Sequence, residues 1–210
     1  MARILIADDH PIFRSGLRQS LENFISKLEV VEVENFKKAL YVSESSNFDL
    51  VIMDIDMPGG NSVKMVETFK SKWPDLPVLV VSAYDENLYA LAFVKAGADG
   101  YLSKNALENE LKIAVESALF NKKLYLSEAV REESFRMFMK TGRAMESSQA
   151  SLSVREREIA QMFISGMGVS EIAGLLDLHT STVSTHRARI FRKMGVENLM
   201  ELSRKYSILG

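Results

Sequence analysis

The chain has 210 residues, of which 47% are hydrophobic and 26% charged, and its formal net charge is −2. These values are ordinary for a soluble globular protein, and the length allows one large domain or two small ones. No apolar run approaches the roughly 20 residues that a membrane-spanning helix needs, and no signal-peptide pattern is present. The absence of cysteine excludes disulfides and thiolate metal sites and agrees with a cytoplasmic location.

Short apolar runs alternate with amphipathic segments of helix length through about residue 121. Runs of this kind are typical of parallel strands that are buried on both faces. Five such βα units predict a doubly wound α/β domain around a five-stranded parallel sheet. The expected strands are 3–7, 28–33, 49–53, 77–81 and 99–103, and the expected helices are 12–25, 35–45, 61–72, 85–96 and 106–121.

The alternation ends after residue 122. Residues 123–150 are polar and show no strand pattern, which predicts a linker with one short helix around Glu128 to Lys140. Only helix-period patterns follow, and they predict a small all-α domain over residues 151–210. Its expected helices are 153–165, 169–176, 180–194 and 198–206.

Polar residues follow four of the expected strands. Asp8 and Asp9 follow the first strand, Asp54 the third, Ser82 the fourth and Lys104 the fifth. Because ligands bind outside the carboxyl ends of the strands in such a sheet, we expect these side chains to meet in one pocket.

Crowded carboxylates repel one another unless a cation lies between them. Three oxygen donors suit Mg²⁺, which is usually bound by one or two carboxylates together with phosphate oxygens. Lys104 and Ser82 are then suited to contact phosphate oxygens. Asp54, between metal and lysine, is expected to be the nucleophile that forms an aspartyl phosphate.

Residues 1–122 resemble a response-regulator receiver domain. The resemblance implies a flavodoxin-like strand order of 2-1-3-4-5, with the ligand site beside strands one and three. It also implies that a sensor histidine kinase donates the phosphoryl group, that the backbone carbonyl of Asp56 joins Asp8, Asp9 and Asp54 as an Mg²⁺ ligand, and that Ser82 and Tyr101 respond to phosphorylation. The matching residues are Asp8-Asp9, Asp54, Met57-Pro58, Ser82-Ala83, Ala96-Gly97-Ala98 and Lys104.

Two residues depart from the usual receiver pattern. Ser62 stands where receivers usually have glycine, and Asn105 stands where many have proline. Neither departure removes a functional group. His10, between Asp9 and a proline, is interpreted as a loop or capping residue without a catalytic role. Apart from phosphorylation of Asp54 and its hydrolysis, no enzymatic activity is expected.

The C-terminal segment carries local signals for two helices joined by a tight turn. Ser153 followed by Glu156 forms a capping box at the start of the first expected helix. The short segment Asp177-Leu178-His179 separates the second expected helix from the third. This spacing fits a helix-turn-helix.

Periodicity separates two faces of the expected helix 180–194. Val183, Ile190 and Met194 fall together and are expected to face the core. The opposite face carries hydroxyls, small groups and arginines, which suits a DNA major groove. The residues expected to face bases are Ser184, Thr185, Ala188 and Arg189, and those expected to contact phosphates are Thr180, Thr182, His186, Arg192 and Lys193. Arg187 lies toward the inner edge, where an intramolecular contact is expected.

This segment resembles the LuxR-type helix-turn-helix, and the whole chain resembles the NarL/FixJ family of response regulators. The resemblance implies a transcription regulator that binds double-stranded DNA as a homodimer, through residues 198–206, the receiver, or both. Leu199, Met200 and Leu202 are the apolar candidates for the dimer face. The matching residues are Leu152-Ser153, Arg155-Glu156-Arg157-Glu158, Gly166, Glu171-Ile172-Ala173, Thr182-Val183, His186, Ile190, Lys193, Gly195-Val196 and Asn198.

The sequence leaves two alternative functions. Asp54-Ile55-Asp56 is the DxD pattern of aspartyl-phosphate phosphatases, but Pro58 stands where those enzymes have Thr or Val, and the acid pair comes earlier in the chain. The second alternative is a regulator that acts through protein contacts without binding DNA. The intact recognition helix argues against this alternative. A gel-shift assay separates this second alternative from DNA binding.

Overall fold

The computed structural model describes residues 1–60, 62–141 and 152–209. The chain folds as two compact units that divide after Arg136, within helix α6 (Glu128–Thr141). Among the described residues, no helix has both the length and the apolar character to cross a membrane.

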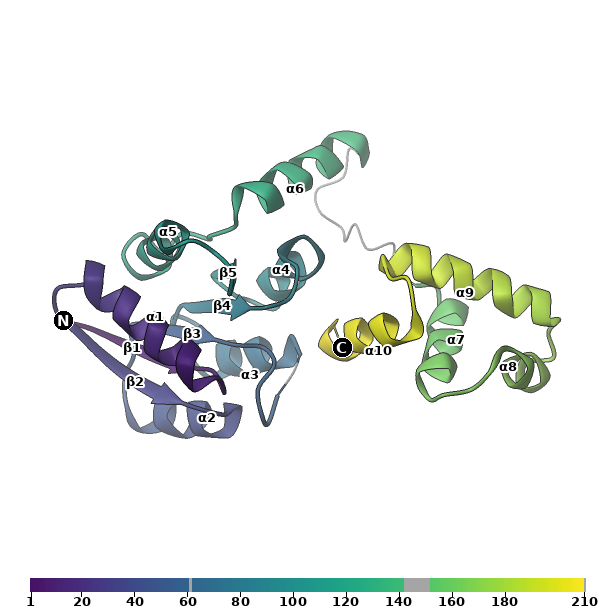
Figure 1. Cartoon of the computed structure of the whole chain (residues 1–210), viewed down its shortest axis with the longest axis horizontal. Coiled ribbons are helices and arrows are strands. Elements are labelled where there is room, and N and C mark those ends of the chain that lie inside the picture. The colour runs from purple at the N-terminus through teal and green to yellow at the C-terminus, as the bar shows by residue number, and fades with distance from the viewer. Residues whose placement is uncertain (61, 142–151, 210) are drawn as a thin grey trace. The chain divides into compact units, whose positions relative to one another are not determined.

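The first unit is built on a single five-stranded parallel sheet with the order β2-β1-β3-β4-β5 (Figure 1). This confirms the predicted fold and strand order. The register places Ala7 opposite Met53 and Met53 opposite Val80, so the first and third strands end together and the fourth continues to Ser82. The strands are β1 (Ala2–Ala7), β2 (Leu28–Val33), β3 (Leu50–Met53), β4 (Val78–Ser82) and β5 (Gly100–Ser103).

Helices cover both faces of the sheet (Figure 1). Leu17 and Leu21 of α1 pack with Leu111 and Val115 of α5 in one apolar cluster that includes Ile52 of the sheet. The remaining three helices cover the other face. The five helices begin and end within three residues of the predicted limits: α1 (Pro11–Phe24), α2 (Phe36–Ser45), α3 (Lys64–Lys72), α4 (Glu86–Lys95) and α5 (Glu108–Leu119).

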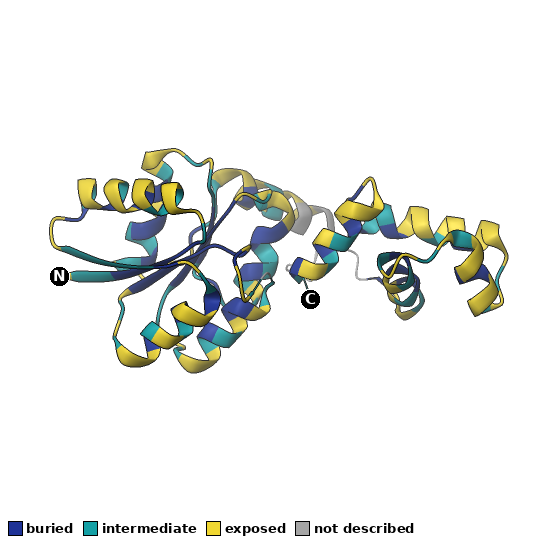
Figure 2. Cartoon of the chain, turned by 60° about the horizontal axis from the view of Figure 1, so that its bottom comes forward, coloured by how far each residue is buried: buried dark blue, intermediate teal, exposed yellow. Residues whose placement is uncertain are grey.

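The strands are apolar along their length because they are buried on both sides. Ile4, Leu5 and Ile6 are successive residues of β1 that point alternately to the two faces, and all three are fully buried. Figure 2 shows the same contrast, with buried strands inside and exposed outer helix surfaces. A continuous apolar run is therefore the correct signature of these strands.

Helix α6 (Glu128–Thr141) follows the sheet and confirms the short helix predicted within the linker. Before it, the backbone N–H of Tyr125 donates to the carbonyl of Asp99, so the chain first runs beside β5. Residues 142–150 of the predicted linker lie outside the described residues. The domain limits at residues 122 and 150 stay predictions.

The second unit is a helical cluster, as predicted. Its core joins Ile159, Ile172, Val183, Ile190 and Leu202 from all four of its helices. These helices are α7 (Val154–Ile164), α8 (Val169–Leu176), α9 (Thr180–Met194) and α10 (Leu199–Leu209).

Local chemistry sets the helix ends in this unit. The Ser153 hydroxyl accepts from the backbone N–H of Glu156, and the Glu156 carboxylate accepts from the backbone N–H of Ser153, which confirms the capping box. Asp177 ends α8 in the left-handed conformation, with φ of 51°. Aspartate tolerates this conformation better than most residues, so it forms the tight turn into α9.

Candidate functional site

The carboxyl ends of β1, β3, β4 and β5 bring the predicted pocket residues together. The ammonium of Lys104 lies 2.6 Å from a carboxylate oxygen of Asp8 and 2.7 Å from one of Asp54. Asp8, Asp54 and Ser82 are all buried. The backbone N–H of Lys104 also donates to the carbonyl of Ser82 over 2.7 Å, which fixes the β5 end against the β4 end.

Burial and the neighbouring charges oppose each other at Asp54. Burial raises the pKa of the Asp54 carboxyl, and the hydrogen bond from Lys104 lowers it only in part. For Lys104, burial lowers the pKa, but hydrogen bonds to Asp54 and Asp8 outweigh it and leave the pKa raised. The ammonium therefore stays charged and holds a buried carboxylate in a position to react.

The loop after Asp54 is shaped by a tight turn. The backbone N–H of Gly60 donates to the carbonyl of Met57 over 3.1 Å, with Pro58 and Gly59 between them. Gly59 has φ of +94°, as the third position of a type II turn requires, and proline favours the second position. This turn follows Asp56 directly, so it sets the direction of the peptide that was predicted to ligate the metal.

The acidic side chains form a cluster suited to a cation. One potential ligand atom from each of Asp8, Asp9, His10 and Asp54 lies within 4.8 Å of the others. Carboxylate oxygens of this kind are the donors that Mg²⁺ prefers. The predicted donor set therefore fits a divalent ion, and His10 adds a nitrogen that the prediction had not included.

The side chain of Tyr101, the second residue of β5, reaches that of Ser82 at the end of β4. The Tyr101 side chain is fully buried, its ring lies 5.8 Å from that of Phe93, and its hydroxyl donates to the carbonyl of Tyr84. Burial raises the pKa of Tyr101, while a hydrogen bond with Ser82 acts in the opposite direction. The aromatic side chain therefore already occupies an inward position beside Ser82.

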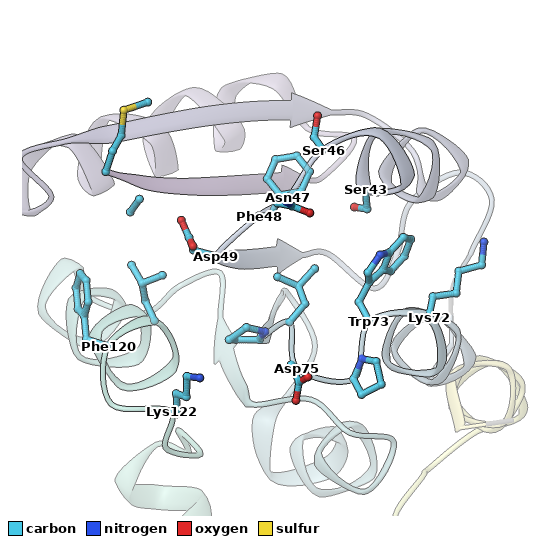
Figure 3. Close-up of a pocket in the computed structure, with 16 residues that line it drawn as sticks. Ser43, Ser46, Asn47, Phe48, Asp49, Lys72, Trp73, Asp75, Phe120 and Lys122 are labelled. Atoms are coloured by element: carbon cyan, nitrogen blue, oxygen red, sulfur yellow. The ribbon is translucent and has the colours of Figure 1, made fainter.

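A separate hollow of about 710 Å³ opens at the other edge of the same sheet. It is lined by residues at the amino ends of strands, including Ala2, Asp49 and Pro77, and by the rings of Phe48 and Trp73 (Figure 3). None of the predicted phosphoryl or metal residues lines it. The acidic cluster is a site because of its chemistry and not because of a large cavity.

Helix α9 presents its two predicted faces. Val183, Ile190 and Met194 are buried, which confirms the predicted core face. Almost all the residues predicted to contact DNA are exposed: Thr180, Thr182, Ser184, Thr185, Ala188, Arg189 and Arg192. The Thr185 hydroxyl donates to the carbonyl of Ser181, so it faces outward as an acceptor together with its methyl group.

Two basic residues of α9 make contacts within the unit, and a third is half-buried. The ammonium of Lys193 lies 2.7 Å from a carboxylate oxygen of the buried Glu156. The guanidinium of Arg187 lies 5.2 Å from the centre of the Phe191 ring, an intramolecular contact as expected. His186 is half-buried, with its Nδ1 atom buried. Lys193 and His186 are therefore less available to DNA than predicted.

The predicted dimer residues of the last helix divide between surface and core. Met200 is 80% exposed and Leu199 is partly exposed, but Leu202 is fully buried in the core of the second unit. The suggestion that Leu202 belongs to a dimer face is therefore wrong, because the helix needs this side chain to pack against α7, α8 and α9.

Sequence reasoning missed three residues that contribute to these sites. Tyr84 donates a hydrogen bond from its hydroxyl to Asp56, His10 lies against Asp9, and Glu156 joins a helix cap to Lys193. Only Glu156 had a usable signal, since it was already recognised as half of a capping box. The others depend on the directions of turns, which periodicity does not give.

Two family models match the chain, each to one of the units. The model of the response regulator receiver domain matches residues 4–116, and that of the bacterial regulatory proteins of the luxR family matches residues 150–206. The receiver model covers more than half of the chain. The class of protein that this fold and site define is thus a receiver joined to a LuxR-type helix-turn-helix.

Characterised relatives share the whole arrangement of the sequence. The response regulator UvrY of Escherichia coli K12 is 30% identical over 203 residues, which are 97% of this chain and 92% of UvrY. The response regulator GacA of Pseudomonas protegens is 30% identical over 97% of this chain and 94% of its own length. The chain belongs to the response-regulator family.

Solved structures of RcsB are similar over almost all of the chain. RcsB of Salmonella enterica serovar Typhimurium, bound to promoter P1flhDC in the presence of the phosphomimetic BeF₃⁻, matches with a TM-score of 0.82 and 28% identity, over 98% of both chains. A structure of two RcsB dimers on two parallel DNAs matches with a TM-score of 0.81 and 27% identity, over 100% of this chain and 99% of RcsB.

Proposed function

We propose that this response regulator accepts a phosphoryl group on Asp54 from a sensor histidine kinase and, as a homodimer, binds duplex DNA through α9 to regulate transcription. The observation that carries the proposal is the Lys104 ammonium between the buried carboxylates of Asp8 and Asp54. The proposal includes a cytoplasmic location, since the target is DNA.

In the proposed reaction, a carboxylate oxygen of Asp54 forms a bond to phosphorus. The bond between phosphorus and the donor nitrogen breaks, and the donor leaves with that electron pair. Lys104 then has a phosphoryl oxygen as a partner, and Ser82 can donate to another. Hydrolysis of the acyl phosphate later restores the carboxylate.

The proposed cofactor is Mg²⁺, bound by the side chains of Asp8, Asp9 and Asp54 and by the backbone carbonyl of Asp56. When bound, it offsets charge on the transferred phosphoryl group. The chain's part is to bring these donors together, because the carboxylates come from two neighbouring strands and the carbonyl from the turn after β3.

The proposed DNA contacts follow the exposed face of α9. Ser184, Thr185, Ala188 and Arg189 are assigned to base edges. Thr180, Thr182 and Arg192 are assigned to phosphates. Lys193 and His186 are assigned to weaker phosphate contacts, because Lys193 pairs with Glu156 and His186 is half-buried. Two half-sites about one helical turn apart are normally needed for specific binding, so a dimer is part of the proposal.

Phosphorylation is tested by intact mass after incubation with phosphoramidate and Mg²⁺. We expect one added phosphoryl group on the wild type and none on Asp54→Asn. Asp56→Asn is the matched control, because it removes a nearby carboxylate but keeps the backbone carbonyl. An adduct on Asp54→Asn, or full phosphorylation in EDTA, would contradict the assignment.

The output is tested with the full chain in the presence and absence of phosphoramidate. We expect sedimentation to show more dimer with the donor, and a selected duplex to bind more tightly. Ser82→Ala should accept the phosphoryl group but lose most of this gain. Equal oligomeric state and equal affinity in all samples would show that the receiver does not control DNA binding.

A further inference from the structure

The imidazole of His10 lies directly beside the acidic cluster. Its Nδ1 atom is 2.7 Å from a carboxylate oxygen of Asp9 and 3.2 Å from one of Asp8. A ring nitrogen of His10 also belongs to a group of possible ligand atoms that includes Asp54, all within 4.8 Å of one another. Neither the phosphoryl chemistry nor the helix cap uses this ring.

The backbone holds the ring in this place. His10 is the N-cap residue of α1, with Pro11 at the first helical position, and its side chain makes no capping hydrogen bond. Its backbone N–H instead donates to a carboxylate oxygen of Asp8 over 2.7 Å. This short turn points the ring back toward the acidic residues. A histidine at the start of a helix could instead point into solvent.

The separations agree with ligands that share one ion. In an octahedral site with bonds of about 2.1 Å, neighbouring ligand atoms lie about 3.0 Å apart. The two distances from Nδ1, 2.7 and 3.2 Å, fall on either side of this value. A cation at the centre of the cluster can therefore take the nitrogen together with the carboxylates, without a large movement of the ring.

We propose that Nδ1 of His10 is a ligand of the bound metal ion and that it shifts the selectivity of the site from Mg²⁺ toward imidazole-preferring divalent ions such as Ni²⁺, with Mn²⁺ serving as the paramagnetic probe of the metal–nitrogen bond. The inference rests on the metal binding that is part of the proposed function. Imidazole nitrogen suits iron, nickel, copper and zinc ions, whereas carboxylate, carbonyl and water oxygens suit Mg²⁺ and Mn²⁺. Replacing an oxygen ligand by a nitrogen ligand therefore changes the relative affinities of the site for different metal ions.

The direct test uses Mn²⁺ bound to the full-length protein at a pH above the ordinary imidazole pKa of about 6.5. Pulsed electron paramagnetic resonance detects the coupling of a directly bound ¹⁴N nucleus to Mn²⁺. We expect this coupling in the wild type and its loss in His10→Asn. Asparagine is a favoured N-cap residue, so this substitution keeps the start of α1.

His179→Asn is the matched control. His179 is also an N-cap residue without a side-chain capping hydrogen bond, at the start of α9, and it belongs to none of the described metal-binding groups. We expect its ¹⁴N coupling to equal that of the wild type. In competition titrations, His10→Asn should lower the preference for Ni²⁺ over Mg²⁺ by at least about tenfold, because losing even an outer-shell partner of a metal ligand typically costs about 10–100-fold in metal affinity.

The outcomes separate the two proposals. Mn²⁺ that binds without ¹⁴N coupling, and an unchanged preference in His10→Asn, would overturn the role of His10 but leave the carboxylate site intact. If Asp9→Asn and Asp54→Asn bind Mn²⁺ as tightly as the wild type, or if the wild type binds none, the metal site of the proposed function fails, and the role of His10 fails with it.

Discussion

The hydroxyl of Tyr84 donates a hydrogen bond to a carboxylate oxygen of Asp56 over 2.8 Å. Each residue lies two positions beyond a residue of the phosphoacceptor pocket, Tyr84 after Ser82 and Asp56 after Asp54. The bond therefore ties the loop after β4 to the loop after β3. It connects the peptide proposed to ligate the metal with the strand end that holds Ser82.

Tyr84→Phe removes this bond and keeps the ring, which packs 5.5 Å from the ring of Tyr89. We expect the phosphoryl group on Asp54 to hydrolyse faster, because the freed loop admits water. A hydrogen bond is worth about 1 kcal/mol net, which corresponds to about fivefold in rate. The decay of phosphorylated mass after removal of the donor measures it. Tyr41→Phe, at an exposed tyrosine, is the control, and equal lifetimes in all three proteins would refute the prediction.

Lys104→Met removes a cation from between two carboxylates and keeps the length of the side chain. We expect Mg²⁺ to bind more tightly, because Asp8 and Asp54 lose their competing ammonium. Phosphoryl acceptance should fall about 100-fold, the usual effect of losing a group that stabilises developing charge. Calorimetric titration and intact mass measure the two effects. Lys72→Met, at an exposed lysine, should change neither, and an unchanged rate in Lys104→Met would exclude the assigned role.

The DNA-contacting face of α9 is tested by two substitutions with different signatures. Arg192→Ala should lower the affinity for all duplexes. It should also reduce the slope of log affinity against log salt concentration by about one unit, because one phosphate contact is lost. Thr185→Ala should instead change which base is preferred at one position of the DNA site, with a change in discrimination of about 1–3 kcal/mol. Binding isotherms over a salt series measure both. Lys112→Ala, on the receiver surface, is the control. If neither variant differs from it, α9 does not enter the groove.

The ion pair between Lys193 and Glu156 predicts acid sensitivity of the C-terminal unit. The hydrogen bond from Lys193 and the backbone N–H bond hold the pKa of Glu156 at about 2, below the ordinary value of 4.5. The folded carboxyl binds its proton more weakly than the unfolded one. Its contribution to stability is therefore complete above pH 4.5 and is lost as the pH falls toward 2.

Calorimetric unfolding of the full chain over this pH range measures the effect. The transition of the C-terminal unit should move to lower temperature on acidification in the wild type and much less in Glu156→Gln. Lys193→Ala should destabilise this unit by about 1–3 kcal/mol at neutral pH. Fluorescence of the single tryptophan, Trp73, reports the receiver separately and should be unaffected by either substitution. Identical pH profiles in wild type and Glu156→Gln would contradict the prediction.

The phosphoacceptor pocket was predictable because topology alone determines it. Once the apolar runs are recognised as parallel strands, Asp8, Asp54, Ser82 and Lys104 must meet at one edge of the sheet, whatever their rotamers. The core face of α9 was predictable for a similar reason. A helical period fixes the common direction of Val183, Ile190 and Met194 before any partner is known.

The contacts that sequence reasoning missed depend on turns and on packing between elements. The ring of His10 faces the acid pair because of one short turn, which no periodicity describes. Lys193 and Glu156 are 37 residues apart, so their pairing needs the crossing of α7 and α9. Leu202 looks like an exposed apolar residue in the sequence, and only the packing of α10 on the other helices shows that it is core.

The distribution of the pocket over the sheet has a consequence for newly made protein. Asp8 and Asp9 come from the first strand, but Lys104 follows the last one, so the pocket is complete only after nearly the entire receiver has been synthesised and has closed around β5. A nascent chain that has exposed Asp54 but still holds β5 in the ribosomal tunnel lacks the ammonium that its acceptor needs. Under the proposed function, such a chain accepts a phosphoryl group only very slowly, and efficient phosphorylation begins once the receiver is complete.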